Sequence, residues 1–392
     1  MNRWLLPEGI EEVVADQALA AESLRRQLLD LFECWGYDLI IPPVIEFTDS
    51  LLTGLGVDLD SKTIKVPDQV SGKTMGFRAD ISPQAARIDA RNSTAGPNRV
   101  CYAGTVLHSE PSDALSSRAP IQVGVEIFGI DTVAADLEVI LLMLQSLALV
   151  TDEKLTLDLG HVGICNWLSR VAKENALPAE DLYELVQSKR LPELEQMIAD
   201  ADLNNVLRQQ LLAVPSLLGA QSVLDEAERL FEEVDEVLEA LVELRMLAKA
   251  LSERVPEVNL FFDLGEMRGS NYHTGVVFGA YVEHLGAAKR VANGGRYNNV
   301  GAAFGRPRAA TGFSADLKLL TQLSDPSEEG ERYAVYAPIS NESGFWKQVN
   351  ELRADGVRVI LGYEDDGVNG ASLGCQQELV FVDGEWKLVA LA

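Results

Sequence analysis

Apolar residues recur at helical spacing in the first part of the chain. Between residues 16 and 35 they are Leu19, Leu24, Leu28, Leu31, Phe32 and Trp35. Because these residues fall on one stripe, we expect an amphipathic helix that ends at Gly36. A longer apolar stretch predicts a second helix from Asp136 to about Val150, and the alternation from Leu155 to Gly160 predicts a strand.

Short β-type runs surround these helices. We expect a short strand at residues 37–41. It should end there, because the two prolines that follow cannot donate hydrogen bonds to a β-ladder. Several short runs within residues 77–129 are typical of an antiparallel sheet. Strand character returns at Leu260 and at residues 276–282, and the glycines of residues 293–295 predict a turn.

The middle and the end of the chain differ in character from this β-rich part. Residues 166–255 consist mostly of helix formers, and the acidic stretch at 222–252 predicts one long, solvated helix. Residues 324–331 resemble a linker, and the strand–helix–strand pattern after them predicts a small α/β domain. We therefore expect an α+β protein with three parts: a core at 1–165 and 256–323, a helical insertion at 166–255, and a C-terminal domain at 332–392.

The net charge restricts the function. The 392 residues include 33 Lys and Arg against 60 Asp and Glu, which gives a formal charge of −27. Affinity for nucleic acids depends largely on cations that neutralise phosphates, so a free-standing nucleic-acid binder is not expected. An anionic membrane surface is an equally poor partner.

Metal sites, disulfides and membrane segments are not expected either. The four cysteines contain no CxxC pair, and His161 and Cys165, four residues apart, fit core packing better than zinc. The most apolar stretch, residues 139–150, is too short to span a bilayer. The N-terminus lacks the basic and then apolar pattern of a signal peptide, so we expect a soluble, cytoplasmic protein.

The strand predicted at residues 121–127 has the most informative polar pattern. Its odd-numbered residues are apolar, whereas its other face presents Gln122, Gly124 and Glu126. An amide, a gap and a carboxylate in this order would suit the floor of a site for a small polar, cationic ligand. Taken alone, a half-exposed strand with polar residues toward water is the simpler interpretation.

Three other segments carry candidate side chains, each with a simpler alternative. Asp80 and Ser82 share strand parity, although either could cap a helix instead. In residues 268–273, Arg268 could hold a carboxylate by a fork of hydrogen bonds, unless the segment is a surface turn. Residues 294–297 (GGRY) fit a tight turn. The chain contains no GxxxxGK[ST], GxGxxG, HExxH or GxSxG motif.

The order of these segments resembles the class II aminoacyl-tRNA synthetase core over residues 1–320, and histidyl-tRNA synthetase in particular. Residues 37–46 are similar to motif 1, which builds the dimer interface in that family; residues 102–129 are similar to motif 2, and residues 312–317 to motif 3. The resemblance implies a class II fold, with an antiparallel sheet flanked by helices. It also implies a histidine-like pocket formed by Asp80, Ser82, Gln122, Glu126, Arg268, Tyr272, His273 and Tyr297.

The chain departs from that pattern where the family binds ATP. The resemblance places His108 at the motif 2 arginine and Leu319 at the motif 3 arginine. Neither residue can supply a permanent bidentate cation to phosphate. Losing two charge-assisted contacts of about 1.5–3 kcal/mol each would weaken the ATP complex roughly 10²–10⁴-fold. The loop at 111–118 is also poor in cations, so the sequence argues against adenylation.

The C-terminal region argues against a tRNA ligand. From residue 331 onward there are 5 Lys and Arg against 10 Asp and Glu, where an anticodon reader should present cations. A synthetase-like chain without its ATP arginines and its tRNA-binding region resembles the family of ATP phosphoribosyltransferase regulatory subunits. Members of that family assemble with a short catalytic subunit that joins ATP and phosphoribosyl pyrophosphate at the first step of histidine synthesis.

This resemblance implies a regulatory subunit without catalytic residues, cofactor or metal. It would form homodimers within a hetero-octamer, activate the catalytic subunit and transmit feedback inhibition by histidine. Asp80, Ser82 and His273 replace the Glu, Thr and Tyr of histidyl-tRNA synthetases, so histidine could instead bind at the junction with the catalytic subunit. A divergent histidyl-tRNA synthetase-like ligase, and a scaffold that never binds histidine, remain as alternatives.

Overall fold

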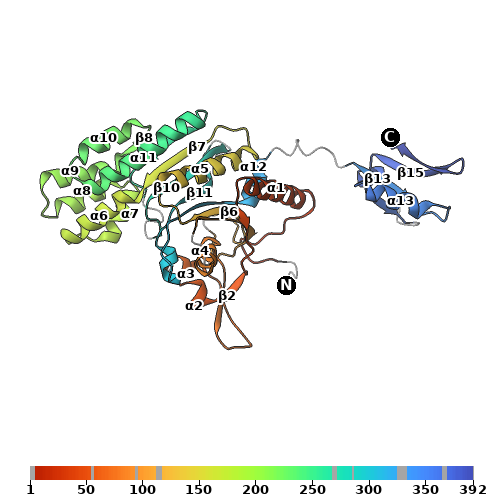
Figure 1. The fold of residues 1–392 in the computed structure, drawn as a ribbon, viewed down its shortest axis with the longest axis horizontal. Helices are drawn as coiled ribbons and strands as arrows, with labels where there is room; N and C mark the ends of the chain where they lie inside the picture. Colours follow the sequence, from red (N-terminus) through yellow and green to blue (C-terminus); the bar gives the residue numbers. More distant parts are fainter. Residues whose placement is uncertain are drawn as a thin grey trace. The chain divides into compact units, whose positions relative to one another are not determined.

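A computed structural model describes residues 5–53, 57–92, 96–111, 117–266, 272–284, 287–324, 333–363 and 369–391. The chain divides into two compact units, residues 1–324 and 325–392 (Figure 1). The predicted linker at 324–331 lies, apart from Ser324, outside the described residues. The expected division of the first unit into core and insertion remains a prediction.

A nine-stranded sheet organises the first unit, in the order β1-β5-β6-β12-β11-β10-β7-β9-β8. These strands are β1 (Asp38–Leu39), β5 (Asn98–Thr105), β6 (Ile121–Phe128), β12 (Ala310–Asp316), β11 (Ala287–Arg296), β10 (Val276–His284), β7 (Thr156–His161), β9 (Asn259–Asp263) and β8 (Leu218–Gly219). Neighbouring strands are antiparallel except for the pairs β1–β5 and β7–β9. The predicted α+β class with a mainly antiparallel sheet is confirmed.

One face of this sheet is covered by helices. The apolar residues of β6 pack in one hydrophobic core with side chains from α1 (Ala15–Cys34), α5 (Val133–Ala148) and α12 (Leu317–Leu323). In Figure 1 these helices lie along the sheet. Within α1 the predicted stripe is only partly buried, because Leu28 and Phe32 are inaccessible whereas Leu19 is 44% exposed.

Shorter elements border the opposite face of the sheet. A three-stranded sheet of β2 (Ile45–Phe47), β4 (Thr74–Phe77) and β3 (Lys65–Pro67) lies in the N-terminal part with α2 (Thr48–Leu51), α3 (Val57–Lys62) and α4 (Ser82–Arg91). Apolar residues of α4 pack against β6 and the 3₁₀ turn η2 (Val300–Phe304). The start of α4 thereby lies beside the polar face of β6, where Gln122 Oε1 accepts the backbone N–H of Ile81.

The region between β7 and β9 is helical, as expected. It contains α6 (Val162–Glu174), α7 (Ala179–Gln187), α8 (Leu191–Ala199), α9 (Asn205–Ala213), η1 (Val214–Ser216), α10 (Ser222–Leu230) and α11 (Asp235–Arg254). The single helix predicted at 222–252 was wrong, because the chain turns between α10 and α11. Phe231 lies at this turn and packs its ring edge-on against Trp167, with 4.9 Å between ring centroids.

The structure decides one open alternative and overturns one further sequence prediction. Residues 80 and 82 do not lie on a strand, since Ser82 begins α4 and its backbone N–H donates to Asp80 Oδ1 over 3.0 Å. Pro83 fits this first helical turn, where no N–H is required. Residues 293–295 are not a turn but lie inside β11, paired with β10 on one side and β12 on the other.

The second unit is a small α/β domain. Its sheet has the order β14-β13-β15-β16, with β13 (Ala334–Pro338), β14 (Arg358–Gly362), β15 (Gln377–Val382) and β16 (Glu385–Ala390). Helix α13 (Phe345–Ala354) packs Phe345 and Val349 against this sheet, and η3 (Ala371–Leu373) precedes β15. Among the described residues of both units, we find no helix that is long and apolar enough to span a membrane.

Candidate functional site

Glu126 lies at the bottom of the site, on the polar face of β6. Its side chain is buried, with the residue only 1% exposed. Tyr102 of β5 donates its hydroxyl to Oε1 over 3.0 Å, and Tyr297, which follows β11, donates to Oε2. Gly312 is directly opposite on β12, and a side chain there would collide with the carboxylate. The glycine therefore makes the space that Glu126 occupies.

This environment disfavours the charged form of Glu126. Burial raises the pKa of its carboxyl to about 7, and the negative charge of Asp80 acts in the same direction, while hydroxyl hydrogen bonds from Ser82, Tyr297 and Tyr102 oppose the shift. Burial also holds the pKa values of the Tyr102 and Tyr297 phenols well above their ordinary range. The phenols are therefore neutral donors, and the site is suited to receive a positive charge.

Asp80 and Gln122 form the second part of the site. Gln122 donates its amide to Asp80 Oδ1 over 2.8 Å and accepts the backbone N–H of Ile81 with Oε1 over 2.8 Å. Ser82, also at the start of α4, has its hydroxyl 3.1 Å from that of Tyr102, which connects this group to Glu126. Asp80 is partly exposed, so it lies closer to solvent than Glu126.

Tyr272 and His273 line the site from the segment before β10. The Tyr272 ring stacks on Tyr297, with 5.1 Å between centroids, and the His273 ring contacts Tyr272 edge-on. Within the described part of the chain, the buried Tyr272 hydroxyl and the buried Nδ1 of His273 have no hydrogen-bond partner. Unpaired buried polar atoms of this kind are what a ligand would satisfy.

The structure thus brings seven of the eight predicted pocket residues together. The seven are Asp80, Ser82, Gln122, Glu126, Tyr272, His273 and Tyr297. Arg268 lies outside the described residues. Sequence reasoning missed Tyr102, which faces Gly124 across β5 and β6 and fills the gap that this glycine leaves.

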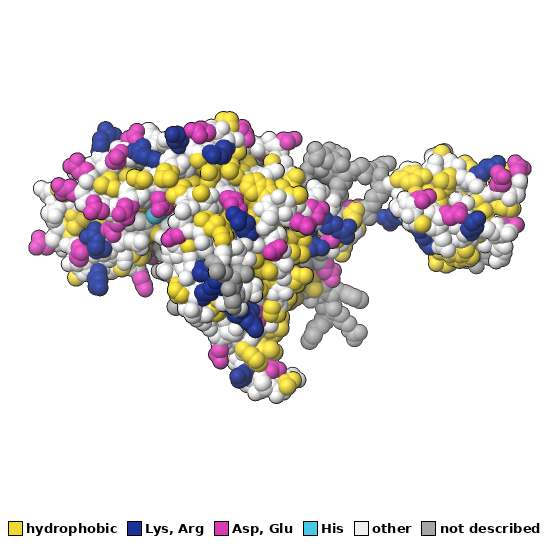
Figure 2. All heavy atoms as spheres, in the orientation of Figure 1, with side chains coloured by type: hydrophobic (Ala, Val, Ile, Leu, Met, Phe, Trp, Pro, Cys, Tyr) yellow, Lys and Arg dark blue, Asp and Glu magenta, His cyan; other side chains and the backbone are white. Residues whose placement is uncertain are grey.

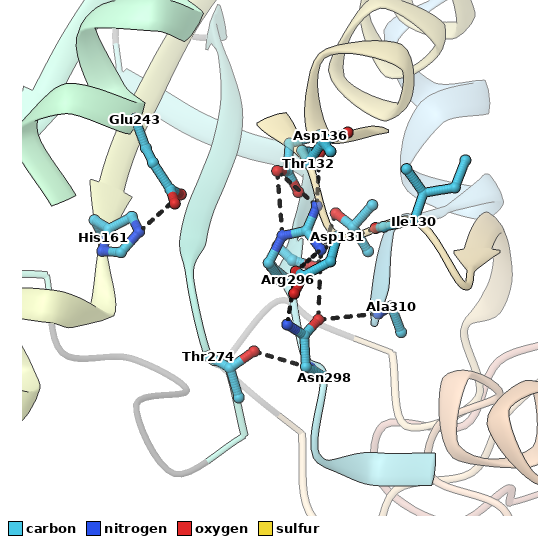
Figure 3. A network of polar contacts seen from close by, with 12 residues as sticks. Ile130, Asp131, Thr132, Asp136, His161, Glu243, Thr274, Arg296, Asn298 and Ala310 are labelled. Atoms are coloured by element: carbon cyan, nitrogen blue, oxygen red, sulfur yellow. Dashed lines mark hydrogen bonds and ion pairs between the residues drawn. The ribbon is translucent and has the colours of Figure 1, made fainter. Parts of the chain in front are cut away.

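Arg296 was also missed, because residues 294–297 suggested a turn. Its guanidinium is buried and binds the fully buried carboxylate of Asp136 over 2.8 Å, the carboxylate of Asp131, and the carbonyls of Ile130 and Thr132. Figure 3 shows the arginine enclosed by this loop, with Asn298 bound nearby. The network anchors the end of β11 and so fixes the position of the next residue, Tyr297.

His161 has a structural role. It lies apart from the Arg296 network, next to Glu243 (Figure 3). Its Nδ1 accepts the backbone N–H of Gly163 and caps α6, while Nε2 lies 3.2 Å from Glu243 of α11. Cys165 is buried one helical turn further on. Among the described residues, we find no cluster of His, Cys, Asp and Glu side chains that could hold a metal ion.

Among the described residues, no free cation lies at the two positions that the resemblance to histidyl-tRNA synthetase assigns to ATP binding, His108 and Leu319. His108 Nε2 lies 3.0 Å from the carbonyl of Ala79, and Leu319 packs against the main core. Arg118 donates to the carbonyls of His108 and Glu8, while Lys318 pairs with Glu11 over 2.6 Å. Hydrogen bonds and ion pairs inside the protein thus already engage the nearby cations.

Comparison with known proteins identifies the family. Residues 9–320 match the histidyl-tRNA synthetase family, and residues 332–389 match the family described as ATP phosphoribosyltransferase subunit HisZ C-terminal domain. The ATP phosphoribosyltransferase regulatory subunit of Ectopseudomonas mendocina is 46% identical over 397 residues, covering 100% of this chain and 99% of that protein. The chain belongs to the ATP phosphoribosyltransferase regulatory subunit family. The ATP phosphoribosyltransferase regulatory subunit of Saccharophagus degradans is 45% identical over 392 residues. The aligned region covers 100% of this chain and 98% of that protein.

Solved structures support this family and its fold. A Bacillus halodurans protein described as an ATP phosphoribosyltransferase regulatory subunit/histidyl-tRNA synthetase superposes with a TM-score of 0.82 at 26% identity, covering 95% of this chain and 96% of that one. The histidyl-tRNA synthetase of Nostoc sp. PCC 7120 superposes with a TM-score of 0.76 at 16% identity, covering 99% and 97%. The predicted membership of the regulatory subunit family, and its synthetase-like fold, are therefore confirmed.

Proposed function

We propose that this chain regulates ATP phosphoribosyltransferase without catalysing its reaction. It assembles with the short catalytic subunit, activates that subunit at the first step of histidine biosynthesis, and transmits feedback inhibition by histidine. The observation that carries this proposal is the combination of two features. The residues around Glu126 form one hydrogen-bonded group, and the resemblance to histidyl-tRNA synthetase assigns His108 and Leu319 to the positions of the family's two ATP-binding arginines.

In this proposal, histidine binds with its imidazole ring inward and its α-ammonium group toward solvent. Its α-ammonium group lies near the partly exposed Asp80 and Gln122, and its imidazole lies at the bottom beside Glu126. Two charged groups of the amino acid then stay close to solvent, and only the ring is fully enclosed. The resemblance to histidyl-tRNA synthetase directs the ligand carboxylate toward Arg268.

Histidine acts on the catalytic subunit by shifting an equilibrium between two states of the assembly. A ligand shifts such an equilibrium only as far as its affinities for the two states differ. A coupling free energy of about 1–3 kcal/mol is sufficient for regulation. In this proposal, the two states of the assembly differ in the position of the start of α4. This segment includes the partly exposed Asp80 and lies beside the pocket.

The test mixes the purified chain with a short-form catalytic subunit and measures formation of phosphoribosyl-ATP. We expect faster turnover with the chain than without it, and inhibition when histidine is added. Unchanged turnover in the mixture would contradict the regulatory role.

Two further measurements separate the alternatives. Histidine-dependent exchange of pyrophosphate into ATP by the chain alone would indicate a ligase and overturn the proposal. The second measurement uses the Glu126→Ala variant. If this variant still activates the catalytic subunit and still transmits inhibition by histidine, then histidine does not act through this pocket and binds elsewhere.

A further inference from the structure

Two hydrogen-bond acceptors meet at the bottom of the pocket. One is the Glu126 carboxylate, whose oxygens already accept the hydroxyls of Tyr102 and Tyr297. The other is the buried Nδ1 of His273, which has no partner among the described residues. Glu126 lies on β6 and His273 in the segment before β10, so a ligand placed between them would contact both.

Two paired glycines hold these acceptors side by side. Gly312 of β12 pairs directly with Gly295 of β11, so side chains at the two positions would point to the same face of the sheet. A Cβ at Gly312 would collide with Oε2 of Glu126, and a Cβ at Gly295 would lie 2.8 Å from Nδ1 of His273. Neighbouring strands lie roughly 5 Å apart, so one small ring can reach both acceptors.

His273 can act as a hydrogen-bond acceptor because its ring is neutral and one of its two nitrogens is therefore unprotonated. Burial lowers the pKa of His273 to about 4, although a hydrogen bond to the Arg296 backbone and the charge of Asp80 oppose this shift. The buried Nδ1 has no hydrogen-bond partner among the described residues, and a neutral imidazole carries its single proton on one of its two nitrogens. The tautomer with the proton on Nε2 leaves Nδ1 able to accept a hydrogen bond from a ligand.

We propose that this pocket binds histidine as its imidazolium ion, with one ring N–H donating to Glu126 and the other to Nδ1 of His273. The inference rests on the proposed function and adds the charge state of the effector. A neutral imidazole has one donor and one acceptor nitrogen, so its bare nitrogen would face a second acceptor. The tyrosine that histidyl-tRNA synthetases carry at this position can donate or accept, and it would tolerate a neutral ring.

The surroundings of Glu126 favour this cation. The groups that face it are neutral or negative: Tyr102 on β5, Ser82 at the start of α4, Tyr297 after β11, and the carboxylate of Asp80. No cation contacts Glu126 among the described residues. When histidine enters with a neutral ring, the proton of Glu126 moves to the imidazole, and the two groups form an ion pair with no net exchange of protons with water.

The proton balance predicts a maximum in affinity near neutral pH. The pair needs one proton in total, and the free imidazole and Glu126 titrate at about 6.5 and about 7. At lower pH a proton must be released on binding, and at higher pH one must be taken up. Histidine affinity should therefore fall by about tenfold per pH unit outside this range.

The decisive experiment is ¹⁵N NMR of ring-labelled histidine bound to the full-length chain in its complex with the catalytic subunit. We expect both ring nitrogens to carry a proton at pH 8, where free histidine is neutral. A bound ring with one bare nitrogen would overturn this inference and leave the proposed function standing. Absence of histidine binding would instead contradict the proposed pocket itself.

Variants separate the role of His273 from a purely structural one. His273→Phe removes the acceptor and should weaken histidine binding about tenfold or more. His273→Tyr restores a hydroxyl, so bound histidine should become neutral and the pH maximum should flatten. Glu283→Gln, an exposed carboxylate on β10, is the control and should leave both properties unchanged. If His273→Tyr keeps a doubly protonated ring, the assigned role of Nδ1 is wrong.

Discussion

Among single residues, Glu126 combines deep burial with an ionisable group and two phenol donors. Its raised pKa means that the folded chain binds a proton more tightly than the unfolded chain does. Between pH 4.5 and 7 the folded state therefore holds more protons, and the free energy of unfolding falls as the pH rises through this window. The carboxylate form is retained at a cost in stability, as expected of a group that serves a ligand.

Replacing Glu126 tests this cost. Urea unfolding at pH 5 and pH 8 should show that the wild-type chain loses about 3 kcal/mol more stability than Glu126→Gln over this interval. The exposed Glu283→Gln variant should behave like the wild type. Parallel pH profiles for the wild type and Glu126→Gln would show that the carboxyl is not perturbed.

Arg296 illustrates a residue that supports the site without facing the ligand. Replacing it by Met leaves Asp136 as an unpaired buried charge, which should lower the free energy of unfolding by about 3–5 kcal/mol. Arg170→Met breaks an exposed pair with Glu236 and should cost about 1 kcal/mol or less. Urea unfolding of both variants compares the two, and equal losses would contradict the structural role of the buried pair.

Among the elements, the pairing of β6 with β12 is what turns a polar strand face into a pocket floor. The sequence predicted the shared face of Gln122 and Glu126 correctly, because side chains along a strand alternate with a period of two, and both residues contact the same group of polar side chains. It could not predict which strand lies opposite, because Gly312 is distant in sequence and pairs through tertiary structure.

Local patterns also failed where tertiary contacts decided the structure. Asp80 and Ser82 read equally well as strand residues or as helix caps, and only the docking of α4 selects the helix start. Gly294 and Gly295 suggest a turn, yet both lie in a central strand where neighbouring backbone and rings leave no room for side chains. Tyr102 gave no signal of function, because an aromatic residue in an apolar strand is typical of a core.

Gly312→Ala tests the pocket floor. Its Cβ would collide with the Glu126 carboxylate and lie 2.5 Å from the carbonyl of Val125, so the floor must distort. We expect a loss of histidine binding in calorimetry and a lower unfolding free energy by about 1–3 kcal/mol. Gly96→Ala, which has open space around its Cβ, should change stability by less than about 0.5 kcal/mol. Normal histidine binding by Gly312→Ala would place the ligand elsewhere.

The whole molecule combines an acidic surface with exposed apolar residues near β1 and β2. Figure 2 shows acidic and basic side chains intermingled on one face of the described residues, without a continuous basic area. Leu39, Ile41, Val44 and Phe47 are between 40% and 88% exposed; the first three belong to the segment that resembles motif 1, and Phe47 directly follows it. Exposed apolar residues gathered in one segment fit the dimer interface that the resemblance to motif 1 leads us to expect.

Sedimentation of the full-length chain tests this interface. The wild type should be dimeric, whereas Ile41→Asp combined with Phe47→Asp should shift the equilibrium toward the monomer, because two charges would be buried without partners. Val70→Asp, at a turn where the side chain is 96% exposed, should remain dimeric. A dimeric double variant would mean that these residues lie outside the interface.

The central claim is that a pocket for an amino acid now regulates a partner's reaction. It is tested most directly by histidine inhibition curves for phosphoribosyl-ATP formation, recorded with the catalytic subunit and either the wild-type chain or Glu126→Gln. We predict that both chains activate the catalytic subunit and that the variant requires at least about tenfold more histidine for half-inhibition. Superimposable curves would contradict the account, since feedback would then not pass through this pocket.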